Sequence, residues 1–311
     1  MRRQRALRLS RRVRDPFWVG ALLDARLWMP DLAVDGGGRL VVPDLGVHLA
    51  KDRHAFFLPQ IALARQAAGE GSVTFSNDAG DGLLVTSGGV TLEVAGPTDF
   101  PLFVEVVARH IYHILRPDPR PLVVWDIGFN VGAASLYYAA QPGVAAVYGY
   151  EPLPAAHRQG LKNLALNPRL ADKITVFPYG VGRADERLEI SYAAWAITSA
   201  GAYGMLTPDG RRMPEGERAT IELRAAADIL GEIRRAHPDA ALVVKMDCEG
   251  SERDIIPALH AAGLLGGIDM AIIETHFPDT REIVRLLGDS GFRVFHPQST
   301  RDIGMVYAAH A

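Results

Sequence analysis

A glycine-bearing segment, DIGFNVG at residues 126–132, follows a strongly apolar run. Glycine at two of its positions permits tight backbone turns and lets a ligand approach closely. The spacing is G-x-x-x-G rather than the G-x-G-x-x-G of dinucleotide sites, and a carboxylate at Asp126 would repel a pyrophosphate but attract an ammonium. The segment therefore favours S-adenosyl-L-methionine, which has no phosphate, over a nicotinamide cofactor, although a purely structural turn remains open. The cofactor-binding candidates here are Asp126, Gly128, Phe129, Asn130 and Gly132.

A second acid ends the next apolar run, in YGYEP at residues 148–152. A carboxylate at Glu151 can accept two hydrogen bonds from a ribose diol, a group that every nucleoside cofactor contains. The alternative is an exposed acid that only ends a strand or caps a helix. Pro152 and, further along the chain, Gly180 complete the predicted cofactor-binding set.

The segment KMDCEGSE, at residues 245–252, carries the most specific pattern. Lys245, Asp247 and Glu249 alternate with apolar neighbours and would share one side of a strand and its exit, where charges need partners or a ligand. Asp247 is the first candidate for a catalytic base. Lys245 either keeps Asp247 ionised or, if buried and neutral, is itself the base. The structural alternative is a Lys–Asp ion pair with Glu252 as a helix cap, and Cys248 is interpreted as a small buried apolar residue.

A fourth polar segment, IIETH at residues 272–276, ends another apolar run. His276 is interpreted either as a base or as a polar residue at the rim of the site. A metal site built from Asp247, Glu249, Glu274 and His276 is conceivable, but nothing in the spacing demands one and no metal is expected. The catalytic candidates are therefore Asp247, Lys245, Glu249 and His276.

These four segments belong to a region in which apolar runs of strand length alternate with helical segments. This alternation predicts a parallel sheet covered by helices on both faces, with ligands at the carboxyl ends of the strands. The predicted strands are 122–127, 146–150, 174–178, 242–247 and 270–274, and the predicted helices are 133–141, 155–167, 225–236, 252–262 and 280–290. Residues 292–295 and 303–307 are predicted to form an antiparallel hairpin.

Together with NLALN at residues 163–167, these motifs resemble the FkbM family of S-adenosylmethionine-dependent methyltransferases over about residues 100–308. The resemblance implies a class I, Rossmann-like, mostly parallel seven-stranded sheet whose terminal strand is antiparallel. It implies a cofactor held by the first turn and by Glu151. It also implies methyl transfer to a hydroxyl of a sugar or natural product, although some members methylate amide nitrogen in peptides. Phe129 departs from the family pattern, in which a small residue is frequent at this position.

The predicted function is therefore O-methylation of a small-molecule, saccharide or natural-product acceptor. N-methylation of a peptide or amide, and an inactive cofactor-binding scaffold, remain as alternatives. Residues 195–218 are rich in glycine, proline and small residues, and are predicted to form a loop that closes over the acceptor. The sequence indicates no oligomeric state.

The amino terminus is rich in arginine and has no acidic residue before Asp15. It forms either a solvated arm or a basic amphipathic segment that rests on anionic lipid or on a partner. Its apolar side would come from Phe17, Trp18, Leu22, Leu23, Leu27 and Trp28. Asp15, Pro16 and Asp24 interrupt it, which excludes a secretory signal.

Three parts are predicted: this arm at 1–30, a smaller α+β region at 31–120 and the methyltransferase domain at 121–311, with the main boundary in RPDPRP at 116–121. In the α+β region we expect strands at 40–42 and 47–49, a helix at 56–67, short strands within 73–94 with a turn at 87–89, and a helix at 99–115 capped by Asp99.

Overall composition narrows the function further. The 311 residues carry a net charge of −3. The protein as a whole would therefore not attract nucleic acid electrostatically, and no nucleic-acid partner is expected. The single cysteine, Cys248, allows no internal disulfide and suits a reducing compartment. Since no apolar run approaches the ~18 residues of a spanning helix, we expect a soluble cytoplasmic protein with at most peripheral membrane contact through its basic arm.

Overall fold

The computed structural model describes residues 13, 15–25, 31–114, 119–192, 217–296 and 304–310. The chain divides into two compact units, Met1–His110 and Ile111–Ala311. In the sequence, the division after His110 falls a few residues before the boundary predicted at 116–121. Each unit is described by itself below.

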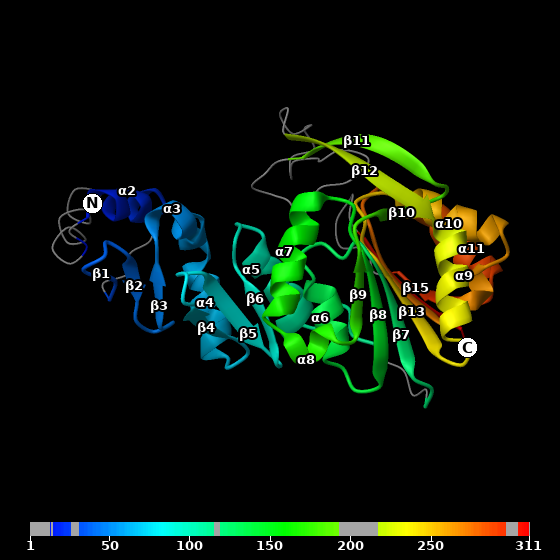
Figure 1. Ribbon diagram of the computed structural model, residues 1–311, viewed down its shortest axis with the longest axis horizontal. Helices are drawn as coiled ribbons and strands as arrows, with labels where there is room; N and C mark the ends of the chain where they lie inside the picture. The colour runs from blue at the N-terminus through cyan, green and yellow to red at the C-terminus, as the bar shows by residue number, and fades with distance from the viewer. Residues whose placement is uncertain are drawn as a thin grey trace. The chain divides into compact units, whose positions relative to one another are not determined.

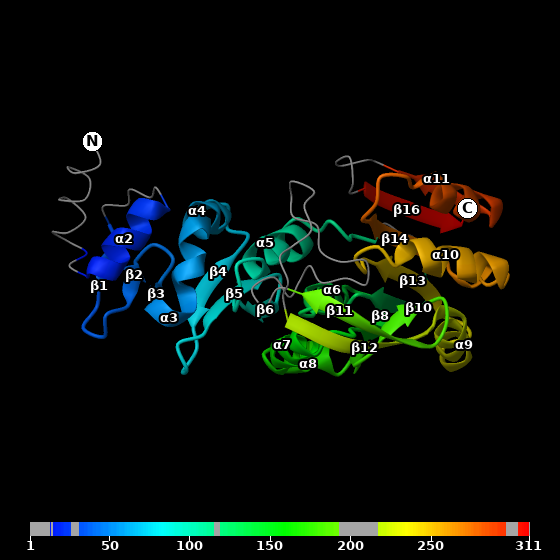
Figure 2. The same cartoon turned by 90° about the horizontal axis from the view of Figure 1, so that it is seen from above.

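The amino-terminal unit contains two small antiparallel sheets, of order β1-β2-β3 and β4-β5-β6. Figure 2 shows helix α4 beside the second sheet. The turn between β5 and β6 has positive φ at Gly88 and Gly89, as a tight hairpin requires. The elements are α2 (Pro16–Asp24), β1 (Ala33–Val34), β2 (Leu40–Val42), β3 (Val47–Leu49), α3 (Lys51–His54), η1 (Ala55–Gln60), α4 (Ile61–Gly69), β4 (Thr74–Asn77), β5 (Leu83–Ser87), β6 (Val90–Glu93), α5 (Asp99–Phe103) and η2 (Val104–Ala108).

Helix α2 buries two of the side chains that were predicted to form the apolar side of the amino-terminal segment. Trp18 and Leu22 are fully buried, and Trp18 Nε1 donates a hydrogen bond to the carbonyl of Gly38 at 2.9 Å. These two side chains therefore do not offer a free surface to lipid, whereas Phe17 is 45% exposed. Leu27, Trp28 and the arginine-rich stretch lie outside the described residues, apart from Val13, so membrane contact through the arm stays a prediction.

The helix predicted at 99–115 is shorter than expected. Its α-helical part, α5, continues into one wide turn, η2, in which the Arg109 amide bonds to the Val104 carbonyl at 2.8 Å. His110 then has a φ of +58°, which no right-handed helix accommodates. Asp99 does not cap the helix as predicted, because its carboxylate instead accepts hydrogen bonds from the amides of Ala95 and Gly96.

The carboxyl-terminal unit is built on a seven-stranded sheet of order β15-β16-β14-β13-β7-β8-β9. Strand β16 is antiparallel to both of its neighbours, and the other printed pairings in this sheet are parallel. This confirms the predicted mostly parallel sheet with a terminal antiparallel hairpin. The strands are β7 (Leu122–Ile127), β8 (Val144–Tyr150), β9 (Ile174–Phe177), β13 (Ala241–Met246), β14 (Met270–Thr275), β15 (Phe292–Phe295) and β16 (Gly304–His310).

The strand order reverses between β7 and β13, and in open sheets of this kind a ligand site lies at the carboxyl ends of the strands beside such a reversal. Helices cover both faces, with α6, α7 and α8 on one side and α9, α10 and α11 on the other (Figure 1). The helices are α6 (Ala133–Ala139), α7 (Pro154–Ala165), α8 (Pro168–Ala171), α9 (Ala226–Ala236), α10 (Glu252–Ala261), η4 (Leu265–Gly267) and α11 (Arg281–Asp289).

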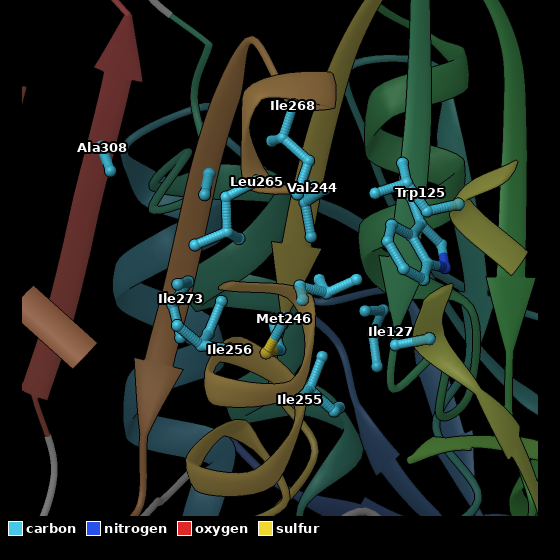
Figure 3. Close-up of a cluster of buried hydrophobic side chains, with 14 of the residues drawn as sticks. Trp125, Ile127, Val244, Met246, Ile255, Ile256, Leu265, Ile268, Ile273 and Ala308 are labelled. Carbon is cyan, nitrogen blue, oxygen red and sulfur yellow. The ribbon is translucent and has the colours of Figure 1, made fainter. Parts of the chain in front are cut away.

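The core of this unit lies between the central strands and helices α9, α10 and α11. Figure 3 shows Ile255 and Ile256 of α10 beside Met246 of β13 and Ile273 of β14, with Trp125 of β7 in the same cluster. All five side chains are at most 1% exposed. Burial of each such side chain contributes about 2 kcal/mol to the free energy of unfolding. This packing holds the ends of β7, β13 and β14 in fixed relative positions.

A further three-stranded sheet, of order β10-β12-β11, was not predicted. Its strands are β10 (Gly180–Gly182), β11 (Glu186–Tyr192) and β12 (Glu217–Ala225). Buried Ile190, Ile221 and Leu223 pack with Leu153 and Ala156 of the α7 region. The loop predicted at 195–218 overlaps β12 at residues 217 and 218, and its remaining residues lie outside the described part of the chain.

Candidate active site

The turn from β7 into α6 brings the first motif against the exit of β13. Gly128, Asn130 and Gly132 have φ values of +84°, +56° and +86°, a region that favours glycine. A Cβ atom at Gly128 would lie 1.8 Å from the carbonyl oxygen of Asp247. Glycine at this position is therefore required for the close approach of the two strand ends that carry the predicted site residues.

Phe129 fills the space behind this turn. Its side chain is buried, and Cβ atoms at Gly149 and Gly160 would lie 2.6 and 2.2 Å from its ring. A Cβ at Gly132 would also meet the ring, at 2.9 Å. Phe129 is absent from the pocket lining described below. The ring thus fixes the packing of α6 and α7 against the sheet, and the interpretation of Phe129 as a cofactor contact loses its basis.

A pocket opens at the carboxyl ends of β7, β8 and β13, next to the reversal in strand order. It contains five of the predicted cofactor-binding residues, Gly128, Asn130, Glu151, Pro152 and Gly180, and two of the predicted catalytic residues, Asp247 and Glu249. The other lining residues are Ile127, Tyr150, Leu153, Val181, Ile190, Ile221, Leu223, Cys248 and Ser251. The lining of the pocket therefore combines these polar groups with side chains that are largely apolar.

Glu151 is a nearly buried carboxylate at the end of β8. Its Oε2 accepts a hydrogen bond from the Asn130 amide and its Oε1 from the Leu153 amide, both at 2.8 Å. Burial raises the pKa of Glu151 to about 7, although these backbone bonds oppose the shift. Each oxygen still has a lone pair for a ligand hydroxyl, so the amides hold the carboxylate in position for a diol.

Asp126 lies behind the pocket, where it is fully buried and absent from the lining. It accepts a hydrogen bond from Ser135 Oγ at 2.6 Å and lies 3.2 Å from Lys245 Nζ. The expectation that Asp126 binds the cofactor ammonium directly is therefore at odds with its position. Its charge is instead compensated by Lys245 within the protein.

Lys245 links this buried acid to the pocket. Its Nζ donates to the Gly128 carbonyl at 2.7 Å and lies 3.7 Å from Asp247 Oδ2. Burial opposes the charge on Lys245, but the carboxylates of Asp126 and Asp247 outweigh it and hold the pKa above its usual range. Of the two roles left open by the sequence, the raised pKa favours Lys245 as a cation beside Asp247 over Lys245 as a neutral base.

His276 stands at the centre of an acidic cluster at the ends of β13 and β14. Its Nε2 lies 3.7 Å from Asp247 Oδ1, 3.9 Å from Glu249 Oε2 and 3.9 Å from Glu274 Oε1. Burial would lower the pKa of His276, but the carboxylates of Glu252, Asp247 and Glu249 raise it to about 10. Burial raises the pKa of Glu249 to about 7 against the opposing charge of His276.

Tyr112 is a site residue that the sequence did not reveal. Its hydroxyl, 3.1 Å from Asp247 Oδ2 and 2.9 Å from Glu274 Oε2, donates toward both acids, and its ring lies under Lys245 Nζ. Burial, followed by the charges of these two acids, raises the pKa of Tyr112 well above its ordinary value, so the hydroxyl remains a donor. The residue lies before the first strand of the sheet, within a segment predicted as helix, and nothing in its spacing pointed to the site.

The strand order of the sheet, the glycine turn after β7 and the acid at the end of β8 together define a class I, Rossmann-like methyltransferase. A family model described as "Methyltransferase FkbM domain" matches residues 126–294, more than half of the chain. The protein belongs to this family, and it is a methyltransferase dependent on S-adenosylmethionine. Among the described residues, no helix combines the length and the apolar character needed to cross a membrane.

Two curated relatives extend this finding. Methyltransferase sdnD of Sordaria araneosa is 24% identical over 220 residues, which cover 62% of this chain and 82% of sdnD. The AMB antimetabolite synthetase AmbE of Pseudomonas aeruginosa is 25% identical over 204 residues, which cover 56% of this chain and 9% of AmbE. The chain thus corresponds to most of the first relative and to a small part of the second.

Solved structures give more distant matches. The methyltransferase FkbM of Methylobacillus flagellatus is 17% identical with a TM-score of 0.42, over 68% of this chain and 51% of that one. An O-methyltransferase family protein of Burkholderia thailandensis is 13% identical with a TM-score of 0.38, over 69% of this chain and 57% of that one.

Proposed function

We propose that this enzyme transfers a methyl group to a hydroxyl of a saccharide or natural product, with Asp247 as the base. The observation that carries the proposal is a single pocket lined both by a diol-type acceptor, Glu151, and by the Asp247–Glu249 segment. The first has the chemistry of nucleoside binding and the second has the chemistry of proton removal. The two therefore suit a donor and an acceptor that meet between them.

The cofactor end of the pocket is held by the chain's own backbone. Glu151 would accept the ribose hydroxyls, and the glycine turn at Gly128 leaves the backbone accessible beside it. Gly180 lets the chain pack closely against Leu223, since a Cβ there would lie 2.6 Å from the Leu223 side chain. When bound, S-adenosylmethionine supplies an electrophilic methyl group on a sulfonium.

The acceptor end of the pocket supplies the base. As the new O–CH₃ bond forms and the S–CH₃ bond breaks, the hydroxyl proton passes to a carboxylate oxygen of Asp247. Lys245 and the Tyr112 hydroxyl face Asp247 Oδ2, and they would hold the carboxylate in position to accept this proton. Glu249 and His276, beside Asp247, would bind other polar groups of the acceptor.

The relatives support an acceptor of small-molecule type. Their names describe a methyltransferase and an antimetabolite synthetase. A polar, partly acidic pocket end also suits a hydroxylated acceptor better than an apolar one.

The proposal is tested by binding first and by turnover second. We expect calorimetric titration to give saturable binding of S-adenosylmethionine and none of NADH, with at least tenfold weaker binding in Glu151→Ala. The exposed acid Asp279, remote from the pocket lining, provides the matched control Asp279→Asn, which should bind as the wild type does.

Turnover is then measured as transfer of a radiolabelled methyl group to a panel of sugars and polyketide alcohols, with primary amides and amines as a second panel. Transfer to a hydroxyl that Asp247→Asn lowers at least 100-fold supports the proposal. Transfer to nitrogen alone, or none to either panel by a protein that binds the cofactor, contradicts it.

A further inference from the structure

Three side chains at the ends of β13 and β14 offer metal-ligand atoms to a common point, and two of them, Asp247 and Glu249, line the pocket. Asp247, Glu249 and His276 each contribute one such atom, and these atoms all lie within 4.8 Å of one another. Asp247 and Glu249 follow β13, and His276 follows β14. The sheet therefore brings together two carboxylates and an imidazole from two neighbouring strand ends.

The distances in this group differ from those of a hydrogen-bonded histidine. The separations of 3.7 and 3.9 Å from His276 Nε2 to Asp247 and Glu249 exceed the ~2.7–3.2 Å of a hydrogen bond. Two ligand atoms that each lie about 2.1 Å from one ion are roughly 3 to 4 Å apart. The separations of Asp247 and Glu249 from His276 therefore match those of ligands around one shared cation.

A fully buried carboxylate stands on the other side of the same imidazole. Glu252 Oε1 lies 3.5 Å from His276 Nδ1 and accepts a hydrogen bond from the Cys248 amide at 2.9 Å. Among the described residues its Oε2, although buried, has no hydrogen-bond partner. A carboxylate behind a histidine ring is the usual outer-shell device that orients the opposite nitrogen toward a metal. His276 Nδ1 is also buried without a hydrogen-bond partner among the described residues, so Glu252 is placed to orient the ring with Nε2 toward the opposite acids.

The charge of the group also favours a cation. Asp247, Glu249, Glu252 and Glu274 surround His276, and the cationic side chains in contact with them are Lys245 and His276 itself. Lys245 shares its charge with buried Asp126 at 3.2 Å. The cluster therefore keeps an excess of negative charge in a half-buried space, where a bound cation would be strongly favoured.

We propose that Asp247, Glu249 and His276 bind a divalent first-row transition-metal cation, with Glu252 as a positioning residue. One imidazole with two carboxylates is a ligand set that suits Mn²⁺, Co²⁺ or Zn²⁺, whereas Ca²⁺ and Mg²⁺ prefer sites with oxygen ligands only. Three protein ligands leave coordination positions open for an acceptor hydroxyl. Binding of the cation stands independently of the methyl acceptor.

The catalytic consequence rests on the proposed function. A metal-bound hydroxyl loses its proton more easily, and Asp247 would then be a ligand rather than the base. As the O–CH₃ bond forms and the S–CH₃ bond breaks, the released proton would pass to Glu274, which borders the three ligands and is held by the Tyr112 hydroxyl.

The test uses the purified chain after removal of metals with a chelator. Mn²⁺ is titrated in while the free aqueous ion is followed by electron paramagnetic resonance, and Zn²⁺, Co²⁺ and Mg²⁺ are titrated by calorimetry. We expect saturation near one Mn²⁺ per chain, at least tenfold weaker binding in Glu249→Gln and His276→Gln, and a loss of about tenfold in Glu252→Gln. The control Asp279→Asn should bind as the wild type does.

Only variants that melt at the wild-type temperature are compared, so that a loss of binding is not a loss of folding. Absence of saturable binding of all four ions overturns the proposal, as does binding that Glu249→Gln and His276→Gln leave unchanged. S-adenosylmethionine is titrated separately on the same samples. A protein that binds this cofactor but no metal contradicts only the cation site, and one that binds metal but no cofactor contradicts only the proposed function.

Discussion

Single side chains in this enzyme act through the charge state that their surroundings impose. Glu151 and Lys245 are both buried, yet Lys245 keeps its charge because two acids face it, whereas the backbone amides and the charge of Lys245 do not outweigh burial at Glu151. The same degree of burial therefore gives one permanent cation and one carboxyl that titrates near neutrality. That difference leads to a pH-dependent cofactor affinity.

For Glu151, we expect the dissociation constant for S-adenosylmethionine to rise about tenfold between pH 8 and pH 6. Its pKa of about 7 means that the acceptor form dominates at pH 8 and is the minor form at pH 6. Calorimetric titration at both pH values measures the change. In Glu151→Gln, binding should be weak at both, and the tenfold ratio should disappear; an unchanged ratio in this variant would assign the titration to another group.

A second prediction concerns Gly128. Gly128→Ala should lower the free energy of unfolding by about 3 kcal/mol or more, since the added Cβ meets a backbone carbonyl at 1.8 Å at a positive φ. Gly143 is the matched control, because it has a similar φ of +82° and nothing within 4 Å of its Cβ position. Gly143→Ala should cost only about 1 kcal/mol of backbone strain. Equal losses in urea denaturation would show that the contact with Asp247 is unimportant.

At the scale of elements, the central sheet was predictable because its strands are buried on both faces. Continuous apolar runs bounded by glycine, proline or charge gave β7 with both ends correct and β14 within one residue. Sheet β10-β12-β11 was missed although β12 alternates buried Ile221 and Leu223 with exposed Glu222, because the glycine-rich stretch before it suggested a loop. The helix at 99–115 failed for another reason, since apolar spacing alone does not reveal a residue with positive φ such as His110.

The missed sheet has a function that substitution can test. Leu223 of β12 lines the pocket, whereas Leu188 of β11 packs on the same small core without lining it. We expect Leu223→Ala to weaken S-adenosylmethionine binding by about tenfold and to cost 2–3 kcal/mol of stability, roughly the value for a buried leucine. Leu188→Ala should cost stability but leave the affinity within about twofold. Equal affinities in the two variants would remove β12 from the cofactor wall.

At the scale of the whole molecule, the site includes a residue that the sequence motifs did not predict, and some of the predicted residues lie outside the pocket lining. Sequence placed Glu151, Asp247 and Glu249 in one pocket because parallel strands end at a common edge. It could not separate the acid that lines the pocket from Asp126, which lies behind it, since both end apolar runs. Nor could it locate Tyr112, whose contacts with Asp247 and Glu274 bridge 135 and 162 positions of the chain. Such long-range contacts come from packing and leave no local pattern.

Stability of the molecule as a function of pH follows from buried acids in both units. Burial raises the pKa of Asp99 to about 6 and that of Glu151 to about 7. Each group is ionised in the unfolded chain above pH ~4 but stays protonated in the folded protein up to its raised pKa. The unfolded state thus binds fewer protons at these two positions in this interval, so their contribution to the free energy of unfolding falls as pH rises from about 4 to 7 and levels off above it.

Asp99 is not part of the pocket lining, so a substitution there tests the pH dependence of stability without changing the pocket. A shift of about two pKa units corresponds to about 3 kcal/mol. Asn keeps an oxygen that can accept from the amides of Ala95 and Gly96 but cannot ionise. Relative to Asp99→Asn, the wild type should therefore lose up to about 2 kcal/mol of this between pH 4.5 and pH 8, with most of the loss complete by pH 6.5. Urea denaturation of both proteins across this range measures the difference, and parallel stability curves would mean that Asp99 is solvated rather than held in a dry site.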